Sequence, residues 1–101
     1  MRAIHVVHLD KHRPALILTR PAVIPFLKKI TVAPITSTIR GLATEVLVGP
    51  ENGLEHRSAV SLDNIITVPR ETLGRAIGYL LASQEASLTA ALHAAFDLDD
   101  S

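Results

Sequence analysis

Short apolar segments, separated by polar, proline- or glycine-containing breaks, run along most of the chain. Their β-branched and apolar residues predict seven strands, over residues 3–9, 13–20, 30–35, 43–48, 58–62, 64–68 and 75–81. The first two segments are close enough to form a hairpin. Pro21 and Pro25 bracket a predicted loop, and residues 49–53 (GPENG) predict a turn. The pattern is typical of a mainly β protein.

Two prolines restrict where their strands can lie. Proline has no N–H to give to a sheet, so Pro14 belongs at the start of its strand or at a sheet edge. Pro34 lies inside the segment 30–35. We therefore expect that segment to be an edge strand or to carry a bulge near its end.

One helix is predicted at the end of the chain. Ser83 suits its N-cap, Glu85 suits its first turn, and the pattern runs to Phe96. Leu88, Leu92 and Phe96 recur at a spacing of four, which predicts one apolar face. Pro69 opens a short helical turn through Leu73. Together these elements predict a single domain over residues 1–101, a small β-barrel or strongly bent sheet whose C-terminal α-helix covers an apolar opening or face.

Composition narrows the class of protein. Apolar residues make up 48% of the 101 residues, which is too many for a disordered tail, and only Phe26, Tyr79 and Phe96 are aromatic, so the core must be aliphatic. The absence of cysteine excludes disulfides and thiolate chemistry. No signal-peptide pattern opens the chain, and no apolar run approaches the roughly 18 residues of a membrane span. We expect a soluble, cytoplasmic protein.

The formal net charge of zero hides a strong asymmetry. Residues 1–40 hold seven Lys and Arg against one Asp, a net charge of +6, whereas residues 41–101 hold three Arg against nine acids, a net charge of −6. Such a division suggests a basic face for a polyanion, although charges separated in sequence need not be separated in space.

Three histidines near the N-terminus have a spacing that resembles a metal site. His5 and His8 lie on a predicted strand, where their side chains point to opposite faces, so they cannot converge on one ion with His12. We therefore predict no metal site, and expect His5 and His8 to be partly buried strand residues. His12 lies in the hairpin loop beside Arg13, where its imidazole could meet a ligand.

The candidate chemistry lies where two predicted strands begin and end. The chain has no G-x-S-x-G elbow, no glycine-rich phosphate loop and few aromatic side chains for stacking on bases. Arg13 begins one strand and Thr36 ends another. If these strands are neighbours, a guanidinium and a hydroxyl could grip one phosphate. The same residues are also explained by a solvated arginine at a strand end and by a turn whose Thr and Ser hydroxyls hydrogen-bond to their own backbone.

The same two segments resemble the signature of the MazF/PemK/Kid family of toxin endoribonucleases, and in particular actinobacterial members with a short first hairpin loop. The resemblance rests on 13-RPALIL-18 and 32-VAPITSTIRGL-42, followed in order by 44-TEVLV-48, 60-VSLDNIITV-68, 73-LGRAIGYL-80 and the closing helix. Either of the first two segments alone would be weak evidence for the family, whereas their combination is specific to it.

The resemblance implies a fold, an activity and partners. It implies an SH3-like β-barrel with a C-terminal helix, working as a homodimer without a cofactor or metal. The activity would be sequence-selective cleavage of single-stranded RNA by 2′-OH attack, giving 2′,3′-cyclic phosphate and 5′-OH ends and arresting growth. A MazE-like antitoxin would cover the RNA groove with its C-terminal segment.

The family pattern also assigns roles to residues. It makes Arg13 and Thr36 catalytic, with a contribution from Asp63 in some members. His12 is the titratable side chain closest to Arg13, so we expect it to serve in proton transfer. The expected RNA-binding residues are Lys11, Arg20, Lys28, Lys29, Ser37, Thr38 and Arg40.

The chain departs from the family pattern at three places. Its first hairpin loop is very short, and only Lys11 and His12 stand where longer loops carry a glycine and a Glu or His that helps in catalysis or RNA contact. Asn64 and Ile66 replace a usual glutamine and arginine, and Ser61 replaces an arginine of one branch. A non-catalytic toxin of the same fold, such as one that poisons gyrase, and a plain RNA-binding barrel remain as alternatives. The sequence names neither the cleavage motif nor the class of target RNA.

Overall fold

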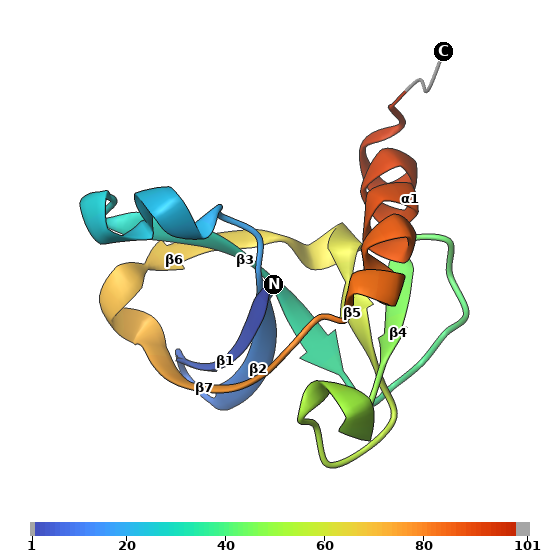
Figure 1. Ribbon diagram of the computed structural model, residues 1–101, viewed down its shortest axis with the longest axis horizontal. Helices are drawn as coiled ribbons and strands as arrows, with labels where there is room; N and C mark the ends of the chain where they lie inside the picture. The colour runs from blue at the N-terminus through green and yellow to red at the C-terminus, as the bar shows by residue number, and fades with distance from the viewer. Residues whose placement is uncertain (1, 99–101) are drawn as a thin grey trace.

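A computed structural model describes residues 2–98 and shows a bent antiparallel sheet with one C-terminal α-helix (Figure 1). Within that range the strands are β1 (Ala3–His8), β2 (His12–Ile17), β3 (Lys29–Thr36), β4 (Glu45–Val48), β5 (Ser58–Ser61), β6 (Ile66–Pro69) and β7 (Leu73–Tyr79). All seven predicted strands exist, with shifted ends. No helix in the described range is long and apolar enough to cross a membrane.

The long strand β3 organises the sheet. Along one edge β3 pairs with β2. Along its other edge it pairs first with β6 and then with β5. The sheet continues from β2 through β1 to β7, and from β5 to β4. In Figure 1 the strands β1, β2, β3, β6 and β7 curl around one side as a half-barrel, and β4, β5 and the helix α1 lie at the other. The mainly β class with a C-terminal helix is therefore confirmed.

The prediction for Pro34 was wrong. β3 is central in the sheet, not an edge strand, yet Pro34 lies in its interior opposite Ala15 of β2. On the other edge β6 pairs as far as Val32, and β5 begins to pair at Ile35. Residues 33 and 34 thus fall between two partners, where a missing N–H removes no ladder hydrogen bond on that side.

Short 3-10 helices shift several predicted boundaries. The loop expected between Pro21 and Pro25 is the 3-10 helix η1 (Pro21–Phe26), and β2 ends at Ile17, because the N–H groups of Leu18 and Thr19 both donate to Thr31 O beyond the ladder. β7 begins at Leu73, two residues before its predicted start, because the turn η4 (Arg70–Thr72) is complete by then.

The helix α1 (Glu85–Phe96) ends where predicted but begins differently. Ser83 lies inside a 3-10 turn, η5 (Ala82–Gln84), and the N-cap is Gln84, so the predicted Ser83 cap was wrong. Leu88 is buried and Leu92 packs on the core, but Phe96 is 57% exposed, so the apolar face is shorter than predicted. Ala91 and Ala95 complete the buried face.

Two hydrophobic clusters occupy opposite faces of the curved sheet, as side-chain alternation requires. Leu16 and Ile35 belong to the cluster that α1 covers through Leu88. The flanking residues Ala15 and Ile17 point the other way, into a second cluster inside the half-barrel. Both clusters are almost wholly aliphatic, as the composition predicted.

Two side-chain amides tie the helix to the sheet. Asn52, buried in the 3-10 helix η2 (Pro50–Asn52), accepts from Gly49 N–H at 3.0 Å and donates through Nδ2 to Tyr79 O at 2.9 Å. Its Nδ2 also donates to Gln84 Oε1 at 2.6 Å, and that oxygen accepts from Leu81 N–H at 2.9 Å. The end of β7, the η2 loop and the start of α1 are thereby fixed to one another.

Candidate active site at the strand ends

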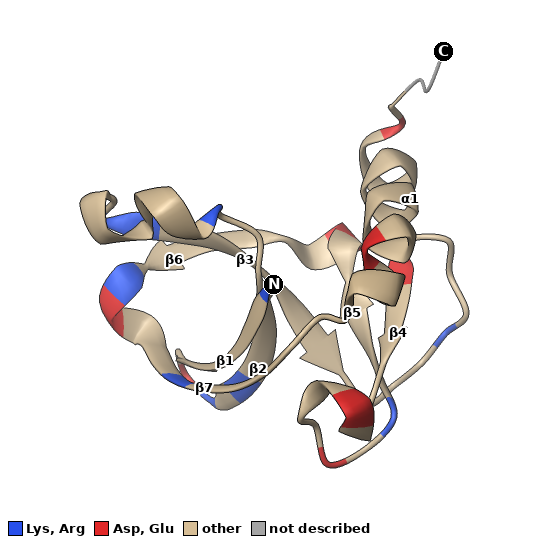
Figure 2. Ribbon diagram, in the orientation of Figure 1, with Lys and Arg blue, Asp and Glu red and all other residues tan. Residues whose placement is uncertain are grey.

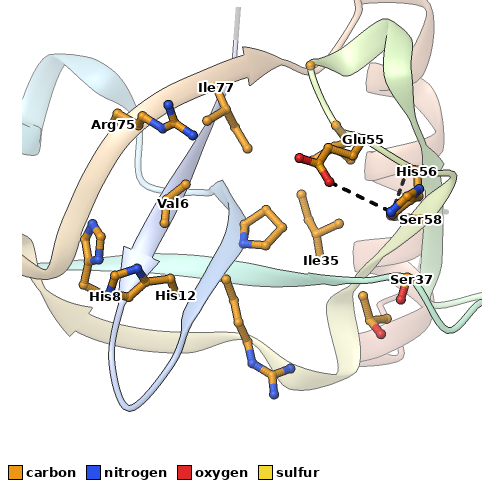
Figure 3. Close-up of a pocket in the computed structure, with 15 residues that line it drawn as sticks. Val6, His8, His12, Ile35, Ser37, Glu55, His56, Ser58, Arg75 and Ile77 are labelled. Carbon is orange, nitrogen blue, oxygen red and sulfur yellow. Dashed lines mark hydrogen bonds and ion pairs between the residues drawn. The ribbon is translucent and has the colours of Figure 1, made fainter.

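A pocket of about 810 Å³ opens between one end of the sheet and the loop that follows η2 (Figure 3). Its apolar lining consists of Val6, Pro14, Ile35, Leu54 and Ile77. Its polar lining consists of His8, His12, Arg13, Thr36, Ser37, Glu55, His56, Ser58 and Arg75, with Gly53 at the loop. Five strands and one loop therefore supply a single hollow, in which basic and hydroxyl groups surround an aliphatic floor.

Arg13 and Thr36 meet at this pocket. The register of β2 and β3 pairs Ala15 with Pro34, and continuing it by two residues brings Arg13 level with Thr36. Residues opposite each other in antiparallel strands share a sheet face, so the two side chains project to the same side. Within residues 2–98 the Arg13 guanidinium makes no hydrogen bond or ion pair, and it is exposed. It is therefore free to bind an anion.

The Thr36 hydroxyl accepts a hydrogen bond within the turn and still has its own hydrogen free to donate. Its Oγ1 accepts a hydrogen bond from Thr38 N–H at 3.1 Å, so the hydroxyl does shape the turn that follows β3. A hydroxyl has one hydrogen to donate besides its lone pairs, and that hydrogen is not used in this bond. The turn and the phosphate contact are thus compatible. Ser37 lines the pocket, and Thr38 is exposed beyond it.

His8 and His12 form a pair across the first hairpin. They are opposite each other in the register of β1 and β2, and their rings meet edge to face, with centroids 4.1 Å apart and planes at 87°. His8 was expected to be partly buried, but it is exposed and lines the pocket. His5 does lie partly buried, with Nδ1 2.9 Å from Gly74 O. Alternation puts His12 on the sheet face opposite to that of Arg13.

An irregularity in β7 brings in a residue that sequence reasoning missed. The pairing of β1 with β7 jumps from His5↔Ala76 to Val7↔Leu73, so two residues of β7, Gly74 and Arg75, oppose Val6 alone. Such a bulge re-aims the side chains of its strand. Arg75 consequently points into the pocket from the side opposite to the η2 loop (Figure 3).

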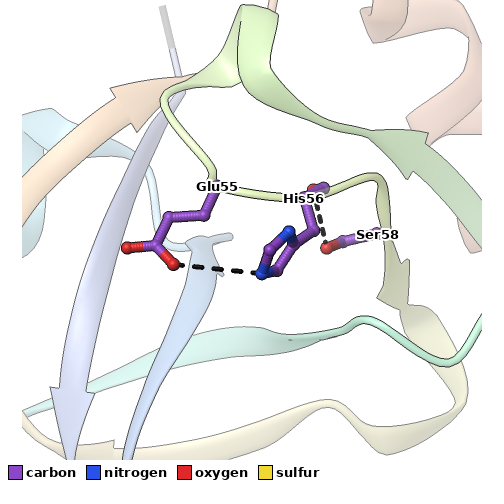
Figure 4. A network of polar contacts seen from close by, with 3 residues as sticks. All are labelled: Glu55, His56 and Ser58. Carbon is purple, nitrogen blue, oxygen red and sulfur yellow. Dashed lines mark hydrogen bonds and ion pairs between the residues drawn. The ribbon is translucent and has the colours of Figure 1, made fainter.

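The far wall of the pocket is a short loop that the sequence did not single out. Glu55 Oε2 lies 3.9 Å from His56 Nε2, and Ser58 Oγ donates to His56 O at 3.0 Å (Figure 4). The side chains of Glu55 and His56 are 94% and 77% exposed, so this ion pair contributes little to stability. No sequence motif marks these residues; their place becomes visible only when the loop folds over the sheet.

Asp63 does not reach the pocket. It lies in the 3-10 helix η3 (Leu62–Asn64), where its Oδ2 accepts a hydrogen bond from Thr44 Oγ1 at 2.6 Å. In the same turn Asn64 Nδ2 donates to Ser61 Oγ at 2.7 Å. Two of the positions that depart from the family pattern therefore bind each other.

The predicted basic residues are spread over the surface (Figure 2). Arg20, Lys28 and Lys29 lie around η1, and Arg20 lines a second, shallower pocket with Arg2. Arg40 lies in the loop between β3 and β4, where its N–H donates to the Glu45 carboxylate. Lys11 lies in the turn between β1 and β2. None of these five lines the main pocket. In residues 2–98 no cluster of three His, Asp or Glu is placed to hold a metal ion.

Comparison with known proteins identifies the family of the chain. Residues 6–96 match the family of PemK-like, MazF-like toxins of type II toxin–antitoxin systems. The chain is 62% identical over 99 residues to endoribonuclease MazF3 of Mycobacterium tuberculosis, covering 98% of this chain and 96% of that protein.

Solved structures resemble it over nearly the whole chain. Toxin MazF-mt6 of Mycobacterium tuberculosis superposes with a TM-score of 0.94 at 61% identity, covering 97% of this chain and 99% of that one. A mycobacterial endoribonuclease in complex with its cognate antitoxin gives a TM-score of 0.86 at 26% identity, covering 96% and 93%. The chain therefore belongs to the PemK-like, MazF-like family of type II toxin–antitoxin toxins.

Proposed function

We propose that the protein is an endoribonuclease that cuts single-stranded RNA at a phosphate held by Arg13 and Thr36. The observation that carries this proposal is the β2–β3 register, which sets the arginine of the RP motif level with the threonine of the PIT motif at one pocket. A free guanidinium can fork onto two phosphate oxygens, and a free hydroxyl hydrogen can reach a third. The relatives named as endoribonucleases support the same activity.

RNA supplies its own nucleophile for this reaction. The 2′-oxygen forms a bond to the adjacent phosphorus as the bond to the 5′-oxygen breaks, giving a 2′,3′-cyclic phosphate and a 5′-OH end. One proton leaves the 2′-OH and one reaches the 5′-oxygen. Negative charge grows on the non-bridging oxygens in the transition state, and Arg13 and Thr36 stabilise it as preorganised donors. The site also fixes the in-line geometry of attack.

We assign a proton-transfer role to His12. Imidazole is the side chain that ordinarily changes charge between pH 5 and 8, and His12 lines the pocket at the hairpin end, next to Arg13 in the chain. It projects to the opposite sheet face from Arg13, so the RNA must wrap around the start of β2 to meet both. Asp63 remains a prediction that rests on the family resemblance alone.

The charges outside the pocket would extend the RNA path. Lys11, Arg40, Arg20, Lys28 and Lys29 are exposed and belong to the chain segment with a net charge of +6. Ser37 and Thr38 follow Thr36 directly and are placed to touch the nucleotide beside the cut. We propose that the distant lysines and arginines bind the backbone of longer RNA, because non-specific affinity comes mainly from phosphate contacts.

We further propose that the toxin acts as a cytoplasmic homodimer held in check by an antitoxin. A solved relative is described as an endoribonuclease in complex with its cognate antitoxin, which supports a similar partner here. The described surface exposes large apolar side chains, including Phe26 at 85% and Leu47 at 52%, which a second chain could cover. Light scattering of the purified toxin, alone and with its co-expressed antitoxin, measures both assemblies.

Incubation of the protein with a long single-stranded RNA in EDTA tests the function. Discrete cuts ending in 2′,3′-cyclic phosphate support the nuclease. Binding without cuts would favour an RNA-binding barrel, and the absence of both would favour a toxin directed at a protein. Arg13→Ala is expected to slow cleavage roughly 100- to 1000-fold. Arg13→Lys should recover part of that loss, since it keeps the charge but not the fork. Full activity in Arg13→Ala would remove Arg13 from the site.

A further inference from the structure

The main pocket holds more space than the proposed phosphate contacts use. Val6, Pro14, Ile35 and Ile77 line it from one face of the sheet. Arg13 and Thr36 project from the other face at the same strand ends, because neighbouring residues on a strand alternate. An aliphatic hollow therefore lies directly beside the site of the scissile phosphate, around the edge formed by the strand ends.

Arg75 is the charged group aimed into this hollow. The bulge in β7 sets it beside Val6, and its side chain points over the floor toward the η2 loop (Figure 3). It is exposed and, within residues 2–98, makes no hydrogen bond or ion pair. The carboxylate among the pocket residues belongs to Glu55, which is 94% exposed and lies beside His56. The Arg75 guanidinium is thus available to a ligand.

The chemistry of this hollow fits a flat ring with acceptor atoms on its edge. A volume of about 810 Å³ lies within the range of small-ligand pockets. Aliphatic side chains accept the face of an unstacked base, and an arginine fork matches paired acceptors such as O6 and N7 of guanine. Unpaired RNA bases are read in this way, splayed out of the strand onto protein surfaces. A bare phosphate would gain nothing from an aliphatic floor.

We propose that this pocket binds one nucleobase of the RNA, next to the phosphate that is cut, and that Arg75 is a specificity-determining residue that donates to the acceptor edge of that base. The inference rests on the proposed RNA cleavage and deepens it. It assigns part of the sequence selectivity to β7, a strand that contributes neither Arg13 nor Thr36.

The test compares cut sites across variants. The wild-type toxin is first incubated with a pool of single-stranded RNA, and the 5′-OH ends are mapped to give the nucleotide preference at each position around the cut. Arg75→Gln is expected to relax the preference at one position by roughly five- to a hundred-fold, the discrimination that one arginine–base contact supplies. Preferences at the other positions should persist.

Two further variants separate base reading from simple charge. Arg75→Lys should relax the same position, because an ammonium lacks the planar fork. Arg57→Gln is the matched control: Arg57 is exposed on the loop beside the pocket, does not line it and carries the same charge. The control should leave the mapped motif unchanged. Thermal unfolding of each variant checks that the fold persists.

An RNA that lacks the base gives an independent readout. With an abasic nucleotide at the affected position, the wild-type rate should fall to that of Arg75→Gln, and the variant rate should hardly change. If Arg75→Gln instead slows all sites equally while Arg75→Lys restores them, Arg75 contacts phosphate and the proposal is overturned. An unchanged motif in Arg75→Gln overturns it as well. Absence of cleavage by the wild type would count against the function itself.

Discussion

The imidazole of His8 occupies the space that a side chain on Gly74 would need. A Cβ at Gly74 would overlap Nε2 and Cδ2 of His8 and come within 3.0 Å of Val6 O. The absence of a side chain in the β7 bulge thus leaves room for the His8 ring, which meets the ring of His12 edge to face. A side chain at Gly74 would therefore displace His8 and disturb its contact with His12.

Because of this overlap, the loss of stability caused by Gly74→Ala should depend on whether the His8 side chain is present. The exposed His8 ring can turn aside, and holding such a side chain off its preferred rotamer costs about 0.5–1.5 kcal/mol, so we expect a loss of that order in the free energy of unfolding, measured with urea. In a His8→Ala background the same change should cost clearly less. Gly41→Ala is the control: its Cβ would meet nothing within 4 Å, but its φ is +73°, so its cost is conformational and His8→Ala should not relieve it. Equal costs at Gly74 in both backgrounds would contradict the steric explanation.

Thr36 should tolerate serine but not valine. Thr36→Ser keeps the hydroxyl and should keep most activity, whereas Thr36→Val keeps the shape and should slow RNA cleavage about 100-fold or more. Losing the acceptor for Thr38 N–H should cost only about 0.5–1.5 kcal/mol, since Thr38 is exposed to water. Single-turnover cleavage with a saturating toxin concentration measures the first effect and urea unfolding the second. Wild-type rates in Thr36→Val would show that the hydroxyl does not touch the phosphate.

His12 should govern how cleavage responds to pH. If its imidazole transfers a proton, the wild-type rate should depend on pH, and His12→Ala should be slower with a flatter profile. His56→Ala, on the far wall of the pocket, should keep the wild-type shape. A His12→Ala profile parallel to that of the wild type would take the residue out of proton transfer.

Salt should weaken the cleavage of long RNA more than that of short RNA. Each phosphate that a cationic side chain neutralises steepens the plot of log affinity against log salt by about 0.7 for single strands. Lys28→Gln with Lys29→Gln should therefore make this plot shallower by roughly 1.4 for an RNA long enough to reach η1. The slope for an oligonucleotide that fills only the pocket should not change. Identical slopes for the long RNA would place its path elsewhere on the surface.

Asn52 and Gln84 should behave as one unit in unfolding. Asn52→Ala leaves Gly49 N–H, Tyr79 O and Gln84 without their partner, and Asn52 is 1% exposed, so a loss of about 1–3 kcal/mol is expected. Gln84→Ala should cost less, since its side chain is more accessible to water. Because the two share the 2.6 Å hydrogen bond, the double variant should lose less than the sum of the single losses. Additive losses would mean that the two amides act separately.

The local sequence pattern predicted the strands well, because runs of β-branched residues between proline and glycine breaks favour the extended conformation of a sheet. Their ends were less predictable. Ser83 looked like an N-cap, but the buried Asn52 draws Gln84 into its network and the chain makes a 3-10 turn before the helix begins. Phe96 continues the apolar spacing of α1, yet the core ends before it.

The sequence by itself determined the β-rich class, the aliphatic core and the family resemblance, since all of these depend on residue type and order. The β2–β3 register of the folded sheet sets Arg13 level with Thr36. Only the tertiary structure decided what surrounds that pair. A bulge in β7 turns Arg75 inward, Gly74 makes room for His8, and the η2 loop supplies the far wall with His56. These residues are distant in the chain and carry no shared motif, so only the folding of the strands against one another could bring them together.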